Sequence, residues 1–224
     1  MFVRLPAVCL FSVTEPAYLA MPAVFRGCVV SFLCEITAST SSPVMVMAAK
    51  EQPVFHYTFG HKLPGILASN GLIPTGSTLP PHERHALWYS ARADFEPTAL
   101  KPVIRGGSST PERVSFQDLH AMVGAYRFCG DANSLRLKPW PLCVRHLGIM
   151  PADARVMESV GKELGAIPSD WWATTHKQLL SDHRFEGWNG VRWVGADIEA
   201  EILRWKANQQ RFASAATGAR WRDI

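Results

Sequence analysis

Residues 53–74 read PVFHYTFGHKLPGILASNGLIP, which is the pattern of a strand running into a helix. The first six residues suit a short strand, in which successive side chains point to opposite faces, so His56 and Tyr57 are expected on different sides. From Gly60 the apolar residues recur at helical spacing, and Asn70-Gly71 is a helix stop signal. This stretch predicts a domain that mixes helices and strands.

Signals of both kinds continue along the chain. Ala86–Ser90 and Gly124–Cys129 have the composition of strands, and Ala152–Leu164 has apolar residues four apart, as in an amphipathic helix. Arg184–Val194 holds Asn189-Gly190 between two aromatic runs and predicts a β-hairpin with Glu186 on its first arm. Shorter signals predict a helical turn at Pro97, a helix from Ser115 through Met122 and a helix capped by Asp197 that ends near Trp205. The fold class expected is α+β, with a small mixed or antiparallel sheet and flanking helices.

Charge divides the chain into parts. Residues 1–49 carry 4 of the 42 charged side chains, and all eight histidines follow Lys50. We therefore expect residues 1–50 to be an extension, with Met47 as the true start, residues 51–205 to form the single domain, and residues 206–224 to be a flexible tail.

Composition narrows the setting. The chain has 224 residues, of which 47% are hydrophobic and 19% charged. Its net charge is +4, and the sequence has no long run of charged residues of one sign. No apolar stretch approaches the roughly 20 residues needed to span a bilayer. The two cysteines of the domain, Cys129 and Cys143, have no zinc-ligand spacing and make no disulfide framework. We expect a cytoplasmic protein with reduced cysteines and no membrane partner.

Several enzyme classes are disfavoured because their motifs are missing. The sequence has no GxGxxG, GxxxxGK[ST], HExxH or GxSxG pattern. His82 and His85 could share a metal, but no third ligand follows at a suitable spacing, so no metal site is predicted.

Five short blocks carry a resemblance. They are His56-Tyr57-Thr58, the helix from Leu63 to Gly71, the extended Leu72-Ile73-Pro74, Trp88-Tyr89-Ser90, and Phe95-Glu96-Pro97-Thr98-Ala99 with Lys101. The chain resembles a family of uncharacterised bacterial proteins whose first block reads HYT, IL, G, WFS and WEPTA. More distantly, it resembles the opening of ADP-ribosyltransferase-type domains, which include DNA-modifying toxins and RNA 2'-phosphotransferases.

The resemblance implies an ADP-ribosyltransferase-like fold and a site for NAD. By matching position, His56 would hold the ribose of NAD, Tyr89 or Trp88 would stack on nicotinamide, and Glu186 would contact the reacting ribose. The residues expected to bind NAD are His56, Tyr57, Thr58, Trp88, Tyr89, Ser90 and Arg127, and those expected to be catalytic are Glu186 and His56. Arg127 has two interpretations, as a ligand of the NAD pyrophosphate or as the partner of an acidic neighbour.

The reaction explains these residue types. Cleavage of the bond between nicotinamide and ribose builds positive charge on the sugar, which a fixed carboxylate such as Glu186 stabilises. Arg184 stands two residues before Glu186, where the arginine-modifying class has a second acid, so arginine is disfavoured as the acceptor. The acceptor could instead be a nucleic acid or a different group of a protein, or the enzyme could simply hydrolyse NAD. The exchange Glu186→Gln is expected to abolish activity and leave the fold intact.

Two other functions compete with this one. The first is a non-catalytic module that binds a protein or nucleic acid through an aromatic-rich surface supplied by the eight tryptophans. The second is a nuclease in which His56, His61 and His82 converge. His56 and Glu186 must lie on the same side of the sheet for the transferase hypothesis to hold, whereas opposite sides favour the binding module.

Overall fold

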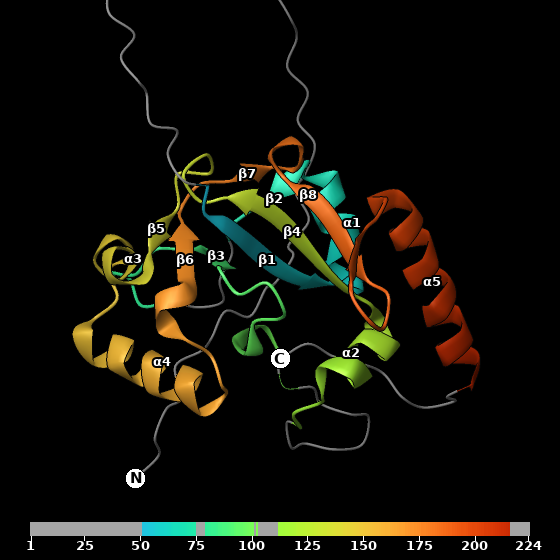
Figure 1. The fold of residues 1–224 in the computed structure, drawn as a ribbon. Coiled ribbons are helices and arrows are strands. Elements are labelled where there is room, and N and C mark those ends of the chain that lie inside the picture. The colour runs from blue at the N-terminus through green and yellow to red at the C-terminus, as the bar shows by residue number, and fades with distance from the viewer. Residues whose placement is uncertain (1–50, 75–78, 101, 103–111, 216–224) are drawn as a thin grey trace, which may run out of the picture. The chain divides into compact units, whose positions relative to one another are not determined.

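A seven-stranded antiparallel sheet forms the centre of the fold, in the order β5-β6-β3-β1-β4-β8-β9 (Figure 1). Its strands are β1 (Pro53–Phe59), β3 (Leu87–Ser90), β4 (Ala125–Asp131), β5 (Lys138–Pro139), β6 (Trp171–Thr174), β8 (Arg184–Trp188) and β9 (Trp193–Gly195). A second, two-stranded sheet pairs β2 (Gly71–Leu72) with β7 (Gln178–Leu179). The predicted α+β class is confirmed, with antiparallel pairing throughout the large sheet.

Five α-helices accompany these strands in the described part of the chain. They are α1 (Leu63–Ala68), α2 (Phe116–Val123), α3 (Trp140–Leu147), α4 (Pro151–Glu163) and α5 (Ile198–Ala215). Four short 3-10 helices also occur, η1 (Gly60–Lys62), η2 (Pro97–Ala99), η3 (Pro168–Asp170) and η4 (Leu180–Asp182). Among the described residues, no helix has both the length and the apolar character needed to cross a bilayer.

The computed structural model describes residues 51–74, 79–100, 102 and 112–215. The expectations for residues 1–50, including Met47 as the start, lie outside the described residues. The same holds for the last nine residues of the expected tail.

The longest strand pairing joins β1 to β4 and defines the two faces of the sheet. It runs through seven Cα pairs, from Pro53 opposite Asp131 to Phe59 opposite Ala125. Residues directly opposite each other in an antiparallel pair project from the same face. We call the side that carries His56 the histidine face, and the side that carries Tyr57 the arginine face, because Arg127 lies opposite Tyr57.

Each face is covered by its own apolar cluster. On the histidine face, Val54, Tyr89 and Phe128 pack with residues of α1 and α5. The arginine face carries two clusters. One packs α3 and α4 against β6, with Trp140 and Trp171 at its centre, and the other packs α2 against Phe59. The sheet is therefore buried from both sides, so a polar side chain on either face needs a partner or an opening.

Most sequence-based elements are confirmed. The helix expected from Gly60 divides into η1 and α1, because Pro64 lacks a backbone N–H and suits the first turn of a new helix. Asn70 ends this segment with a φ of 47°. The Asp197 side chain accepts a hydrogen bond from the backbone N–H of Ala200 at 2.8 Å and caps α5, as predicted.

Two boundaries differ from the prediction. Helix α5 continues to Ala215 instead of ending near Trp205, because residues 206–215 are rich in alanine, glutamine and other strong helix formers. In the β8–β9 hairpin, Trp188 lies opposite Trp193, and the N–H of Asn189 bonds the carbonyl of Arg192. The turn therefore spans Asn189–Arg192, and its two central residues are Gly190 and Val191 instead of Asn189 and Gly190.

Among the strands and α-helices, four have no counterpart in the prediction, namely β5, β6, β7 and α3. The strands β5 and β7 have two residues each, which is too short for an alternating pattern. Helix α3 begins with Trp140-Pro141 and has only eight residues. These elements form because their neighbours in space complete them.

Gly60 and Gly65 offer a matched test of close packing. A Cβ on Gly60 would lie 2.3 Å from the carbonyl oxygen of Val123 and 2.7 Å from the Trp205 ring, whereas a Cβ on Gly65 meets nothing within 4 Å. We expect Gly60→Ala to destabilise the protein by about 1–3 kcal/mol. Gly65→Ala should stabilise it by up to about 1 kcal/mol, because alanine favours a helix. Urea unfolding measures both, and equal effects would contradict this packing.

Candidate functional site

The strand register places the two residues predicted to be catalytic on opposite faces. Arg127 lies opposite both Tyr57 and Glu186, so Glu186 belongs to the arginine face. His56 lies opposite Phe128, which in turn lies opposite Phe185. The expectation that His56 and Glu186 act on one ribose is therefore wrong, because side chains on opposite faces of a buried sheet cannot reach the same ligand.

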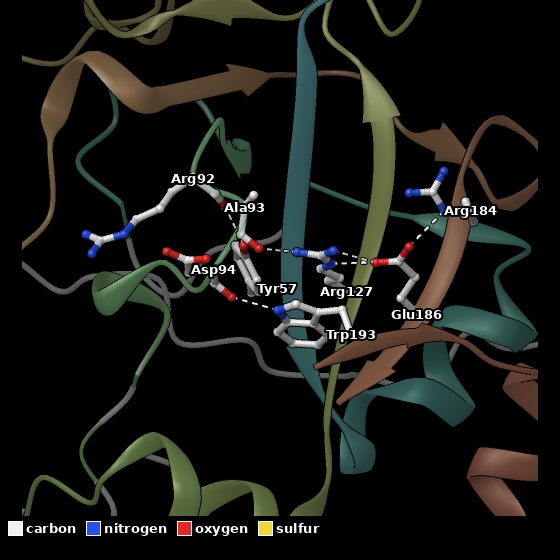
Figure 2. A network of polar contacts seen from close by, with 8 residues as sticks. All are labelled: Tyr57, Arg92, Ala93, Asp94, Arg127, Arg184, Glu186 and Trp193. Atoms are coloured by element: carbon white, nitrogen blue, oxygen red, sulfur yellow. Dashed lines mark hydrogen bonds and ion pairs between the residues drawn. The ribbon is translucent and has the colours of Figure 1, made fainter. Parts of the chain in front are cut away.

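The Glu186 carboxylate is fully engaged in ion pairs (Figure 2). Arg127 Nε donates to Glu186 Oε2 at 2.7 Å, and Nη2 lies 2.6 Å from the same oxygen. Arg184 Nε donates to Oε1 at 2.8 Å. Burial alone would raise the pKa of Glu186, but the hydrogen bonds from the two arginines outweigh it and hold the pKa below its ordinary value. Glu186 is a buried structural anion.

Arg127 is the hub of this network. Its guanidinium carbon lies 4.3 Å from the Phe55 ring centroid and 4.7 Å from that of Trp193, and Nη1 donates to the carbonyl of Ala93. The prediction that Arg127 pairs with an acidic neighbour is confirmed by its contacts with Glu186. The alternative role, binding of the NAD pyrophosphate, would require breaking these contacts on the face away from His56.

The network fastens the loop after β3 to the sheet. Tyr57 Oη donates to the carbonyl of Arg92 at 2.5 Å, Arg127 bonds the next carbonyl, and Trp193 Nε1 donates to that of Asp94 at 2.7 Å. Figure 2 shows these side chains reaching from the sheet toward three consecutive residues of the loop. Tyr57, which was predicted to bind NAD, is therefore part of the scaffold.

Ser90 and the block from Phe95 to Ala99 are also structural. Ser90 Oγ donates to Glu96 Oε2 at 2.8 Å, and Thr98 Oγ1 donates to Oε1 at 2.7 Å. The buried Glu96 also accepts from the backbone N–H of Thr98 and thereby caps η2. These contacts explain why serine, glutamate, proline and threonine occur at this spacing.

The histidine face carries a different group of polar side chains. His56 Nδ1 donates to the carbonyl of Trp88 at 2.8 Å. Since a carbonyl can only accept, the neutral ring carries its proton on Nδ1 and presents Nε2 as an acceptor. Desolvation lowers the pKa of His56 to about 4, against the smaller opposing effect of the hydrogen bond. His56 is therefore neutral at physiological pH.

Tyr89 lies beside His56 on this face. Phe55 of β1 lies opposite Ser90 of β3, so Tyr89 lies opposite His56. The centroids of the Tyr89 and His56 rings are 5.6 Å apart. Of the two aromatic residues predicted to stack on nicotinamide, Tyr89 is thus the one that shares a face with His56. Trp88 points to the other face and packs on Trp140. Thr58 and Tyr89 are both buried on the histidine face, with 6% and 3% of their surface exposed, whereas His56 is half-buried.

His183 completes the group, although sequence reasoning did not find it. Its Nδ1 donates to the carbonyl of Leu179 at 2.8 Å, which leaves Nε2 to accept a hydrogen bond from Tyr89 Oη at 2.8 Å. Its ring stacks on that of Tyr89 with 5.9 Å between centroids. His183 stands just before β8, in a segment without a sequence pattern of its own. We call His56, Tyr89 and His183 the histidine cluster.

Metal binding and thiol chemistry find no support among the described residues. No group of three or more histidine, cysteine, aspartate or glutamate side chains in these ranges could hold a metal ion. His82 is exposed in the loop before β3 and does not belong to the histidine cluster. Cys129 and Cys143 are buried free thiols, and burial raises the pKa of each to about 12. The expected reduced, structural cysteines are consistent with this geometry.

Comparison with protein-family models, with characterised proteins and with solved structures finds no match to this chain. What the site can do therefore follows from its geometry and chemistry.

The two arginines that bond Glu186 should differ in importance. The Arg127 side chain is 9% exposed and that of Arg184 is 70% exposed. Removing the partner of a buried charge costs about 3–5 kcal/mol, whereas an exposed pair contributes about 0–1 kcal/mol. We expect Arg127→Met to lower the free energy of unfolding far more than Arg184→Met, as measured by urea titration. Glu186→Gln should also destabilise the fold, contrary to the sequence-based expectation, and similar small losses in all three would contradict the network.

The neutral His56 makes stability depend on pH. The unfolded chain binds the imidazole proton below a pKa near 6.5 and the folded protein only below about 4, so stability falls as pH falls through this window. Between about pH 7.5 and about pH 5 we expect wild-type protein to lose roughly 1–2 kcal/mol more than His56→Gln. Urea unfolding at the two pH values tests this, and equal losses would show that His56 does not titrate differently on folding.

Proposed function

We propose that this domain is a nucleotide-binding module whose ligand is NAD, held on the histidine face by His56, whose ring lies beside the buried Tyr89. The observation that carries the proposal is the pairing of these two side chains at the centre of the sheet, on the face away from Glu186. They are the two residues that the resemblance assigns to ribose and nicotinamide. The third residue of that assignment is engaged elsewhere.

The chemistry of His56 suits a sugar hydroxyl. Its Nδ1 is committed to a backbone carbonyl, and Nε2 makes no hydrogen bond within the described residues. A neutral imidazole nitrogen accepts a hydrogen bond from a hydroxyl donor such as that of ribose. With a pKa of about 4, the ring keeps this acceptor over the whole physiological range. The half-buried position of His56 leaves the acceptor within reach of a ligand.

Because Glu186 lies on the opposite face, the proposed site binds NAD without cleaving it. Without a carboxylate placed beside the ribose, the positive charge that develops on the sugar has no counter-charge, and the transition state gains little over the ground state. The other kind of binding module, which would bind a protein or nucleic acid through an aromatic-rich surface, has less support. Each of the seven described tryptophans is buried or half-buried, and none belongs to the exposed apolar side chains.

Transfer or hydrolysis is the second candidate, and one observation favours it. Asp182 directly precedes His183 in the chain, and its negative charge adds to the effect of burial that raises the pKa of Tyr89 and opposes the effect of burial that lowers the pKa of His183. Asp182 is exposed at the edge of the histidine cluster. Asp182 is therefore the candidate carboxylate for an NAD-cleaving reaction on this face, with a nucleic acid, a protein or water as acceptor.

Calorimetric titration of the full chain with NAD tests the binding. We expect His56→Ala to weaken binding at least about tenfold, because a buried hydrogen bond to the sugar is lost. His82→Ala is the matched control, since it removes an exposed imidazole from a loop. Absence of NAD binding to the wild-type chain, or equal affinities for both variants, would refute the proposed site.

Release of nicotinamide, measured on the same samples, separates the two candidates. No release supports a module that binds NAD without cleaving it, whereas release unaffected by Asp182→Asn would contradict both the binding proposal and the role of this carboxylate. Release that disappears in Asp182→Asn but persists in a folded Glu186→Gln variant would establish the enzyme and replace the binding proposal.

A further inference from the structure

Cationic side chains from three separate segments gather beside His146 near the end of α3. His146 Nε2 lies 3.4 Å from Thr175 Oγ1, which places the segment after β6 against the helix. The backbone N–H of Arg84 bonds the carbonyl of Leu147 at 2.9 Å, which brings the loop before β3 to the same place. Lys138 of β5 pairs with Ala173 of β6, two residues before Thr175.

The electrostatics of His146 agree with this arrangement. Desolvation lowers the pKa of His146, and the positive charges of Lys138, Arg84 and His176 lower it further. These three side chains are exposed, so their charges face solvent. We call the surface that Arg84 and Lys138 form with His146 and His176 the cationic surface, since Arg84 and Lys138 give it positive charge at neutral pH, where the lowered pKa of His146 leaves that ring uncharged.

The segments that form the cationic surface contain one acidic residue close by, Glu83, which directly precedes Arg84. Residues 132–152 hold no aspartate or glutamate but include Arg136, Lys138 and Arg145, and residues 175–181 hold His176 and Lys177 without an acid. Within the described residues, no salt bridge involves Arg84, Lys138 or Arg145. Uncompensated cations are costly to place together, because their mutual repulsion destabilises the fold. A binding partner of opposite charge would relieve that repulsion.

We propose that the cationic surface binds the phosphate backbone of a nucleic acid. Several exposed cations on different segments suit a polymer with evenly spaced negative charges, whose neutralisation releases counterions. The hydroxyl of Thr175 adds a donor of the type that commonly contacts phosphate oxygens. This inference concerns a different surface from the histidine cluster and does not depend on NAD binding.

The test is fluorescence anisotropy with a labelled 20-nucleotide single strand and the matching duplex, using the full chain at several salt concentrations. The variant Arg84→Gln with Lys138→Gln removes two charges from the cationic surface. Arg155→Gln with Lys162→Gln removes two exposed charges from α4 and leaves the net charge of the chain equal to that of the first variant. Circular dichroism confirms that both double variants are folded.

We expect the first double variant to bind the nucleic acid at least about tenfold more weakly than wild type. The slope of log K against log salt concentration should become less steep by about 1.8 for the duplex, which is about 0.9 for each of the two lost phosphate contacts. The α4 double variant should bind within about twofold of wild type. Equal weakening in both variants would show that net charge alone attracts the nucleic acid and would overturn the proposal. Absence of binding at about 50 mM salt, or equally tight binding of polyglutamate, would overturn it as well.

Discussion

The pairing of β1 with β4 is the constraint on which the rest of this structure depends. Seven consecutive residue pairs join these strands, and each pair assigns two side chains to one face. The pairing of β4 with β8 carries the assignment onward to Glu186. A shift of one residue in either register would exchange the two faces and bring Glu186 to the side of His56. The chemistry available on each face follows directly from this register.

The arginine face shows what a buried charge requires. Removing a guanidinium and a carboxylate from water is costly unless their hydrogen-bonding groups are satisfied. Arg127 meets this requirement with Glu186, the carbonyl of Ala93 and two aromatic rings. The loop after β3 supplies the carbonyls, so the same contacts that satisfy the charge also hold the loop. Residues that looked like ligand-binding residues in the sequence are used here to build the fold.

The histidine face follows the opposite arrangement, because its polar groups are neutral. Both imidazoles donate through Nδ1 to a backbone carbonyl, and one of them accepts from Tyr89. Burial lowers the pKa of both rings, which keeps them uncharged among apolar neighbours. A face of this kind suits hydrogen bonding to an uncharged part of a ligand, whereas the cationic surface at the end of α3 suits phosphate.

The sequence by itself determined the α+β class, the opening strand and helix, the hairpin around Asn189 and the caps at Ser115 and Asp197, because each depends on contacts between residues close in the chain. It also determined that His56 and Tyr57 face different sides. Only the tertiary structure decided which of them shares a side with Glu186, because register is set by pairing between residues about 55 to 78 positions apart in the chain. For the same reason, the place of His183 beside Tyr89 could not be found from local patterns.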